Sequence, residues 1–195
     1  MARKYELKQR AERQEATRRR IVEAAVELHS TVGPSRTTVS AIAERAGVQR
    51  HTYYRHFPDE RSLGFACSGL YTERNPLPDP APWREIADPR QCLRRGLGEL
   101  YAYYERNEPM LANVVRDAEV DPLTRELSEL RFGPGLGAIR DALGAALPRG
   151  HRKAQAALDL ALEFRTWRQL VRSSGLTGRQ AADLMAGVLL CAASA

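Results

Sequence analysis

One short stretch, GVQRHTYYRHF from Gly47 to Phe57, concentrates side chains that can contact a polyanion. It holds two arginines, two histidines, two tyrosines and a threonine, and only Val48 and Phe57 are plainly apolar. Read as a helix, it uses Val48, Tyr53 and Phe57 as anchors to neighbouring helices. An α-helix fits the major groove of DNA, where Arg donates two hydrogen bonds to guanine. The side chains that then point outward are Arg50, His51, Tyr54 and Arg55.

The charge of the chain is concentrated near this stretch. The 195 residues carry a net charge of +6. Up to Arg61 there are 13 Lys and Arg against 8 Asp and Glu, whereas the remainder holds 17 against 16. A local basic excess indicates a polyanionic partner, either nucleic acid or an anionic membrane surface. The alternative is a basic face that is simply solvated.

The elements before and after this stretch are expected to be short helices. Apolar residues at helical spacing from Ile21 predict an amphipathic helix that ends at Gly33 and Pro34. SRTTVSAIAERAG predicts a second helix, capped by Thr37 or Thr38 and ended by Gly47. Pro58 is expected in the first turn of a further helix. Short helix, glycine turn and short basic helix form a helix-turn-helix pattern.

The rest of the sequence predicts helices as well. Five prolines between residues 75 and 89 indicate a boundary or a long loop. No strand alternation is visible, so we expect an all-α protein. RFGPGLG, with Gly133 to Gly137, is expected to break one helix as a hinge or a widening of a pocket. The helical patterns after the prolines cover roughly 89–107, 108–119, 122–147, 151–174 and 177–193.

The motifs together carry a resemblance to a known family. TTVSAIAERAGVQRHTYYRHFPDERSL, preceded by IVEAAVELHSTVG, resembles the N-terminal helix-turn-helix domain of the TetR family of bacterial transcriptional regulators. The match extends from Ile21 to Leu70. The resemblance implies a three-helix DNA-binding domain followed by a larger helical ligand-binding and dimerisation domain. The expected divisions are a basic arm at 1–16, the helix-turn-helix domain at 17–63 and the C-terminal domain at 64–195.

The resemblance also implies which residues contact DNA. Early residues of the third helix would face bases, Ser40 would reach a base or a phosphate, and a further group would hold the backbone. The base-facing group is Gln49, Arg50, His51 and Tyr54, and the backbone group is Thr37, Thr38, Thr52, Tyr53 and His56.

One position departs from the family pattern. The family usually has a Lys at the start of the fourth helix, whereas this chain has Glu60 followed by Arg61. Either Arg61 makes that phosphate contact, or backbone N–H groups make it alone. The basic arm at 1–16 can compensate by reaching the minor groove. By its sequence this segment can be a helix extension or a mobile arm, and the alternative to a DNA contact is disorder in the free protein.

The resemblance implies a cytoplasmic, ligand-responsive repressor that binds a palindromic operator as a homodimer and is released by a small molecule. The homodimer would form through the last two helices, where the small residues Ala181, Ala182, Ala186 and Gly187 permit close approach. A purely intrachain core is the alternative. Polar candidates for an effector pocket are Arg94, Asn113, Arg116 and Glu163. The large candidates, each of which can instead be core, are Trp83, Tyr101, Tyr104, Met110, Val114, Phe132, Phe164 and Trp167.

Other classes of protein find little support in the sequence. HExxH, GxSxG and paired CxxC motifs are absent, and the four histidines are not spaced as metal ligands, so neither an enzyme nor a cofactor is expected. Cys67, Cys92 and Cys191 lie far apart and are expected as reduced thiols. No signal peptide or membrane span is expected, because the longest apolar run, LMAGVLLCAA, is too short. Two alternatives remain: a small-molecule-binding protein or enzyme that keeps the fold without specific DNA binding, and a nonspecific nucleic-acid or membrane-surface binder.

Overall fold

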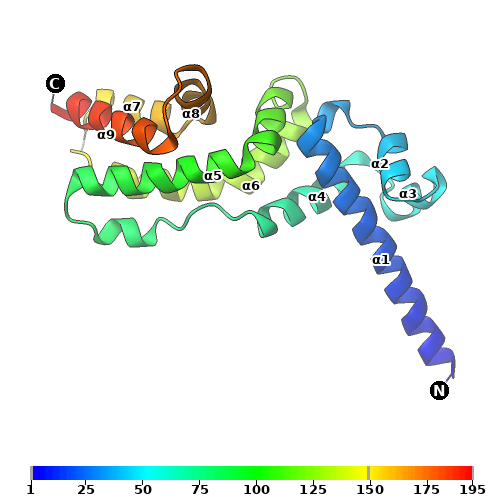
Figure 1. Cartoon of the computed structure of the whole chain (residues 1–195). Helices are drawn as coiled ribbons and strands as arrows, with labels where there is room; N and C mark the ends of the chain where they lie inside the picture. Colours follow the sequence, from blue (N-terminus) through cyan, green and yellow to red (C-terminus); the bar gives the residue numbers. More distant parts are fainter. Residues whose placement is uncertain (1, 149, 195) are drawn as a thin grey trace. The chain divides into compact units, whose positions relative to one another are not determined.

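The computed structural model describes residues 2–148 and 150–194, which form helices and turns and contain no strand (Figure 1). The prediction of an all-α protein is therefore confirmed for this part of the chain. The helices are α1 Ala2–Thr31, α2 Val39–Arg45, α3 Arg50–His56, α4 Glu60–Arg74, α5 Pro89–Asp117, α6 Pro122–Gly144, α7 Arg152–Leu162, α8 Phe164–Arg168 and α9 Gly178–Ser194. Short 3₁₀ turns cover Pro34–Arg36 and Ala81–Glu85, and a π-helical turn covers Gln169–Ser173.

The helices pack as two units. The N-terminal unit comprises the chain up to Asn75 together with Pro109–Arg131, and the C-terminal unit comprises Pro76–Glu108 together with the chain from Phe132 onward. The last turns of α5 and the first turns of α6 thus pack with the predicted helix-turn-helix segment. The functional boundaries at residues 16 and 63 stay predictions, because packing by itself does not assign a function.

The core of the N-terminal unit forms where the apolar stripe of α1 meets α2, α3 and α4. Ile21 and Ala25 on α1 are fully buried, and Ile42, Tyr53 and Phe57 pack into the same cluster. These positions repeat every three or four residues along each helix, so each helix turns one apolar face inward. Burial of this cluster fixes the two short helices α2 and α3, which could not persist alone.

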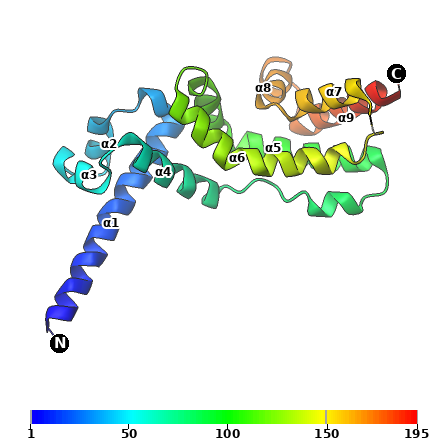
Figure 2. The same cartoon turned by 180° about the vertical axis from the view of Figure 1, so that it is seen from behind.

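Helix α1 extends far beyond this core (Figures 1 and 2). The sequence of residues 1–16 is compatible with a helix extension or with a mobile arm, and the structure shows a helix extension, because α1 begins at Ala2. The side chains from Tyr5 to Ala16 are almost all exposed. Strong helix formers fill this stretch, and Lys8 forms an ion pair with Glu12 one turn later. Because the packed half of α1 already provides the nucleus, each added residue only elongates an existing helix.

In the C-terminal unit, α5 and α6 approach each other closely at Gly96. A Cβ atom at Gly96 would lie 2.5 Å from Leu143 Cδ2 and 2.9 Å from Trp83 Cε3. A Cβ atom at Gly135 would similarly lie 2.6 Å from Leu77 Cδ1. These glycines therefore allow packing distances that any larger residue would prevent.

Two predicted interruptions are wrong. RFGPGLG does not break its helix, because α6 runs through Pro134 to Gly144. The patterns at 89–107 and 108–119 are also one helix, because α5 runs through Pro109. Proline removes one backbone hydrogen bond and crowds the preceding turn, yet tertiary packing can hold a helix together across it.

A predicted single helix over 151–174 is also wrong, because α7 ends at Leu162. The Tyr101 hydroxyl donates a hydrogen bond to the Ala161 carbonyl at 2.9 Å, and the Tyr104 hydroxyl donates to the Leu162 carbonyl at 2.5 Å. Glu163 then takes an extended conformation with ψ 129°. The two tyrosines satisfy carbonyls that lose their helical partners at this end.

Helix α9 packs against α7 and contributes small residues to the core of its own unit (Figure 1). Ala181, Ala182 and Ala186, three of the four small residues predicted to permit close approach of a second chain, are buried inside the protomer and serve intrachain packing. The fourth, Gly187, is half-buried and has no atom within 4 Å of its Cβ position. The same helix exposes Leu184 and Val188, which are 47% and 40% accessible. None of the helices described combines the length and the apolar character that a bilayer-spanning segment needs.

Candidate nucleic-acid interface

A glycine turn sets the direction of α3 after α2. The Gly47 N–H donates to the Glu44 carbonyl at 3.0 Å and the Val48 N–H donates to the Ala43 carbonyl at 2.9 Å. This pair of bonds is the Schellman arrangement, which requires a left-handed residue, and Gly47 supplies it with φ 63°. The predicted end of α2 at Gly47 is thus confirmed, and α3 starts three residues later.

One face of α3 holds the helix on the core. Tyr53 and Phe57 are 2% and 1% exposed, and their ring centroids lie 6.2 Å apart. The Arg18 guanidinium from α1 stacks over the Phe57 ring at 4.9 Å. Burial, followed by the nearby Glu60 carboxylate, raises the pKa of Tyr53 to about 12. Tyr53, predicted to hold the DNA backbone, therefore has its ring in the core, where it positions the rest of α3.

The opposite face of α3 is open to solvent. Tyr54 is 45% exposed, and its ring meets that of Tyr53 edge-on at 5.3 Å, which orients it. Ser40 on α2 is also exposed. The four predicted base-facing residues are therefore all accessible to solvent. The exposed side chains on and beside α3 are Gln49, Arg50, His51, Tyr54 and Arg55.

The predicted backbone-binding threonines have local roles at the start of α2. The Thr38 Oγ1 accepts a hydrogen bond from the Ala41 N–H at 3.2 Å and so caps the helix. The Thr37 hydroxyl donates to the Gly33 carbonyl at 2.7 Å. Thr38 remains exposed and Thr52 is half-buried. Local hydrogen bonds therefore hold Thr37 and Thr38 in place at the start of α2.

His56 lies at the last turn of α3 with a partly buried ring. Burial lowers its pKa below the usual value, and the adjacent Arg55 and Arg18 add to that effect. Its Nε2 atom is buried and has no hydrogen-bond partner among the residues described. The neutral imidazole is thus the favoured form near pH 7.

Arg61, the proposed replacement for the missing lysine, is already paired. Its guanidinium binds both carboxylate oxygens of Glu126, with Nη1 at 2.7 Å from Oε2, and stacks over the Phe65 ring at 5.1 Å. The Asp59 carboxylate accepts the Ser62 N–H at 2.6 Å, so an acidic side chain caps the start of α4. Helix α4 consequently begins at Glu60, and Pro58 precedes the cap instead of lying in the first turn. A phosphate bound by Arg61 at the start of α4 would have to displace the Glu126 carboxylate from Arg61, next to the Asp59 carboxylate that caps the helix.

The C-terminal end of α5 holds the chain between α1 and α2. Asn113 Nδ2 donates to the Ser30 carbonyl at 2.9 Å, and Arg116 Nη2 donates to the Val32 carbonyl at 3.0 Å. Asp117 Oδ2 accepts the Ser35 N–H at 2.9 Å. Asn113 and Arg116, considered from the sequence as pocket lining, therefore bind backbone groups at the end of α1.

Burial and hydrogen bonds together set the charge states at this clamp, which we define as the contacts of Asn113, Arg116 and Asp117 with residues 30–35. Burial works to raise the pKa of Asp117, but hydrogen bonds from Arg116 and Ser35 outweigh it and hold the pKa below the usual value. Burial lowers the pKa of His29 to about 4, although Asp117 opposes the shift. The Cys67 Sγ lies 3.7 Å from the neutral ring at Nδ1. The clamp thus contains one ionised carboxylate and one neutral imidazole at neutral pH.

The large residues predicted to line an effector pocket are mostly interior. Val114 and Phe132 are half-buried, and the other six are buried. Four of them, Tyr101, Tyr104, Phe164 and Trp167, form an aromatic cluster in the C-terminal unit, where Tyr104 lies 5.6 Å from Phe164 and 6.0 Å from Trp167 between ring centroids. The Trp167 Nε1 atom and the Tyr103 hydroxyl are buried without a hydrogen-bond partner among the described residues.

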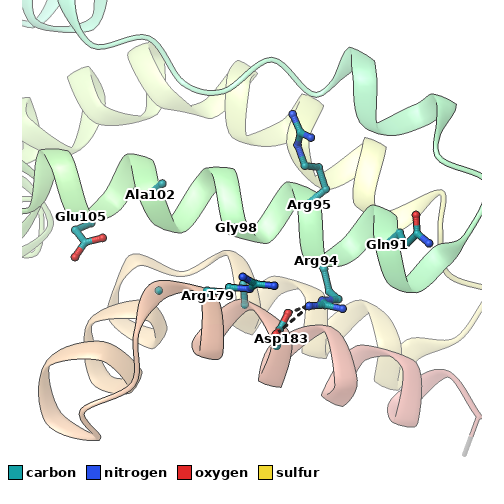
Figure 3. Close-up of a pocket in the computed structure, with 10 residues that line it drawn as sticks. Gln91, Arg94, Arg95, Gly98, Ala102, Glu105, Arg179 and Asp183 are labelled. Carbon is teal, nitrogen blue, oxygen red and sulfur yellow. Dashed lines mark hydrogen bonds and ion pairs between the residues drawn. The ribbon is translucent and has the colours of Figure 1, made fainter.

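An open groove of about 490 Å³ lies elsewhere in the C-terminal unit, between α5 and the start of α9 (Figure 3). The Arg94 guanidinium crosses it to the Asp183 carboxylate, and Arg179 points into it from α9. None of the eight predicted effector residues lines this groove. Arg94, considered from the sequence as polar lining, does lie on its wall.

The helix-turn-helix segment matches a family model. Residues 21–67 match the model described as bacterial regulatory proteins, tetR family. The chain is 29% identical over 120 residues to the HTH-type transcriptional regulator TtgR of Pseudomonas putida, an alignment that covers 61% of this chain and 50% of TtgR. The chain therefore spans about half the length of that relative.

Solved structures extend the likeness along the chain. A Mesorhizobium loti protein assigned to the TetR family has a TM-score of 0.65 at 17% identity, over 92% of this chain and 97% of that one. NalD of Pseudomonas aeruginosa has a TM-score of 0.61 at 23% identity, over 93% and 97%. At these identities the likeness shows a shared fold. Residues 21–67 thus carry a helix-turn-helix that matches the TetR family of bacterial regulatory proteins, and the chain shares the fold of solved TetR-family structures along nearly its whole length.

Proposed function

We propose that this protein is a DNA-binding transcriptional regulator whose recognition helix is α3. The observation that supports it best is the division of α3 into a buried anchoring face and an exposed face that carries Arg50, His51 and Tyr54. Arg can read guanine through two hydrogen bonds in the major groove, and Tyr and His can bind bases or contact the thymine methyl group. Gln49 and Ser40 extend the same surface. Thr38, Thr52 and His56 border it as contacts to phosphate.

The proposed regulator acts as a homodimer on an inverted repeat. Each recognition helix would read one half-site, with the half-sites about one helical turn of DNA apart. Exposed apolar residues on the last helices support the homodimer, because Leu160 on α7 is 55% accessible and Leu184 and Val188 on α9 are also exposed. Such a face gains stability when a second copy covers it.

The proposed effector site is the aromatic cluster of Tyr101, Tyr104, Phe164 and Trp167. Buried polar groups nearly always have partners, so the unpaired Trp167 N–H and Tyr103 hydroxyl are donors that a ligand could satisfy. A ligand that binds here would favour one conformation and DNA another, and the coupling between the two would be reciprocal. NalD is described as the secondary repressor of a multidrug efflux pump. Repression with release by a small molecule is the mode we propose here.

Selection from random double-stranded DNA at one fixed, near-physiological salt concentration tests the central proposal. The wild-type protein should enrich an inverted repeat, and Tyr54→Ala should not. Arg50→Ala should weaken binding to the selected site by about 1–3 kcal/mol and relax the preference at one base position. Salt must be constant because nonspecific affinity depends steeply on it.

Arg90→Ala is a matched control, because Arg90 is an exposed arginine on α5 far from α3 in the sequence. It removes the same charge and should leave the selected motif unchanged. Failure of the wild-type protein to enrich any motif would contradict the proposal. The C-terminal unit would then be the part to test, as a small-molecule-binding protein.

A further inference from the structure

The net positive charge of residues 1–61 lies in the first part of the chain, residues 1–20. Residues 1–20 contain eight Lys and Arg and three Glu, whereas residues 21–61 contain five basic and five acidic residues. The segment that matches the family model, residues 21–67, therefore carries no net charge. A surface that binds a polyanion gains most of its affinity from cations. Those cations must then come mainly from the N-terminal extension of α1, which we define as residues 5–20.

The charges of the extension are distributed unevenly around the helix. At 100° per residue, Arg13 and Arg20 share one side of α1 with Arg10 beside them, and Glu12 and Glu15 lie on the other side. Glu6 lies between Arg10 and Arg13, so the first side keeps three arginines against one glutamate. Arg20 identifies the direction of the basic side, because its Nη1 atom lies 3.9 Å from the Cβ position at Gly47 in the α2–α3 turn. The basic side of α1 therefore lies next to the α2–α3 turn.

Ion pairing sharpens the difference between the two faces. On the acidic side Lys8 pairs with Glu12, and the Arg19 Nε atom pairs with Glu23 at 3.2 Å. Within the described part of the chain, the side chains of Arg10, Arg13 and Arg20 form no ion pair, and all three are exposed. Their charges are thus available to an external anion.

We infer that the basic side of this extension binds the sugar-phosphate backbone of duplex DNA flanking the half-site that α3 reads. This inference rests on the proposed function. Arg10 and Arg20 lie about 15 Å apart along α1, a length that spans on the order of four phosphates of one strand. The contact supplies the cations that the start of α4 lacks, since Arg61 is paired with Glu126.

The width and the apolar content of the extension indicate which part of DNA it can contact, and whether DNA or a membrane is the better partner. A helix about 10–12 Å wide cannot enter a minor groove about 6 Å wide, and α3 is the helix that we propose occupies the major groove. The contact that we infer for the extension is therefore with the sugar-phosphate backbone. An anionic membrane would require a broad apolar face, whereas Tyr5 and Leu7 are the large exposed apolar side chains described in the extension. Duplex DNA is therefore the favoured partner.

Two charge-matched double variants of the full-length protein test the inference. Arg10→Gln/Arg13→Gln removes two cations from the basic side, and Lys8→Gln/Arg19→Gln removes two from the paired side. Affinity for the selected duplex, carrying about ten base pairs of flank on each side, is measured across a series of salt concentrations. We expect the first variant to lower the slope of log affinity against log salt by about 1–2, because each lost phosphate contact contributes about 0.9. We expect the second variant to retain the wild-type slope.

Duplexes with and without flanks distinguish a direct contact with the flanking backbone from a long-range electrostatic attraction that does not need the flanks. Removal of the flanks should abolish the difference between the wild type and the Arg10→Gln/Arg13→Gln protein. Equal losses in both double variants, or a wild-type slope in both, would overturn the inference. Binding of the wild type to phosphatidylserine vesicles in preference to a flanked duplex would overturn it too. If the wild type selects no site at all, the proposed function fails first, and a random-sequence duplex still shows whether the extension binds phosphate.

Discussion

At the scale of single residues, Asp117 shows how one buried carboxylate holds the chain between α1 and α2, at the start of the helix-turn-helix. It is 2% exposed, and it accepts hydrogen bonds from the Ser35 backbone and from Arg116. Arg116 also donates to the Val32 carbonyl. The chain can pass this close only because Gly33 has no side chain and adopts φ 105°.

Gly33→Ala is expected to destabilise the protein by about 3 kcal/mol. The new Cβ would face both a disfavoured positive φ and atoms only 2.2 Å away on Arg116 and 2.6 Å away on Asp117. Equilibrium urea unfolding measures the loss. Gly175→Ala is the control, because Gly175 also has a positive φ, of 72°, but no atom lies within 4 Å of its Cβ position. It should cost about 1 kcal/mol, and equal losses in the two variants would contradict the steric explanation.

At the scale of elements, the end of α7 depends on side chains from α5. Tyr101→Phe should cost about 1–3 kcal/mol of unfolding free energy, because it leaves the Ala161 carbonyl without its donor. Thermal or urea unfolding with the matched Tyr103→Phe variant checks the cause. The Tyr103 hydroxyl is buried without a partner among the described residues, so its removal should be neutral or stabilising. A loss in Tyr103→Phe as large as that in Tyr101→Phe would show that the hydroxyl's hydrogen bond is not the reason.

The sequence predicts the first elements well because their signals are local. Apolar spacing from Ile21 and the left-handed turn at Gly47 lie within a few residues of the helices they define. The end of α7 has no such local signal, because its capping hydroxyls come from residues about 60 positions away. Pro134 gives the opposite error, since its local signal for a break is overridden by packing.

The candidate site likewise has some features that follow from local sequence and others that depend on long-range contacts. Exposure of Arg50 and Tyr54 follows from the helical period of α3, which a sequence displays directly. The pairing of Arg61 with Glu126 joins residues 65 positions apart, and the clamp made by Asn113 joins residues more than 80 positions apart. Long-range pairs of this kind have no counterpart in the pattern of one sequence, so the sequence could not show that Arg61 is already occupied.

At the scale of the whole molecule, the exposed apolar face of α9 predicts the oligomeric state. Leu184→Glu should convert the proposed homodimer into a monomer, because a carboxylate would have to be buried at the interface. Light scattering coupled to size-exclusion chromatography measures the mass. Leu130→Glu is the control, since Leu130 is 50% exposed on α6. A dimer that survives Leu184→Glu and dissociates with Leu130→Glu would place the interface elsewhere.

The three cysteines differ in a way that makes the native protein easy to label. Burial raises the pKa of Cys67 to about 11 and raises that of Cys92 as well, and both thiols are buried. Cys191, on the last turns of α9, is exposed. A maleimide fluorophore at neutral pH should therefore attach at one place in each free protomer, without any engineered substitution. Cys191 lies seven residues after Leu184 on the same face of α9, so a second copy that covers this face would slow the labelling. The labelling rate would thus report whether the protomers associate.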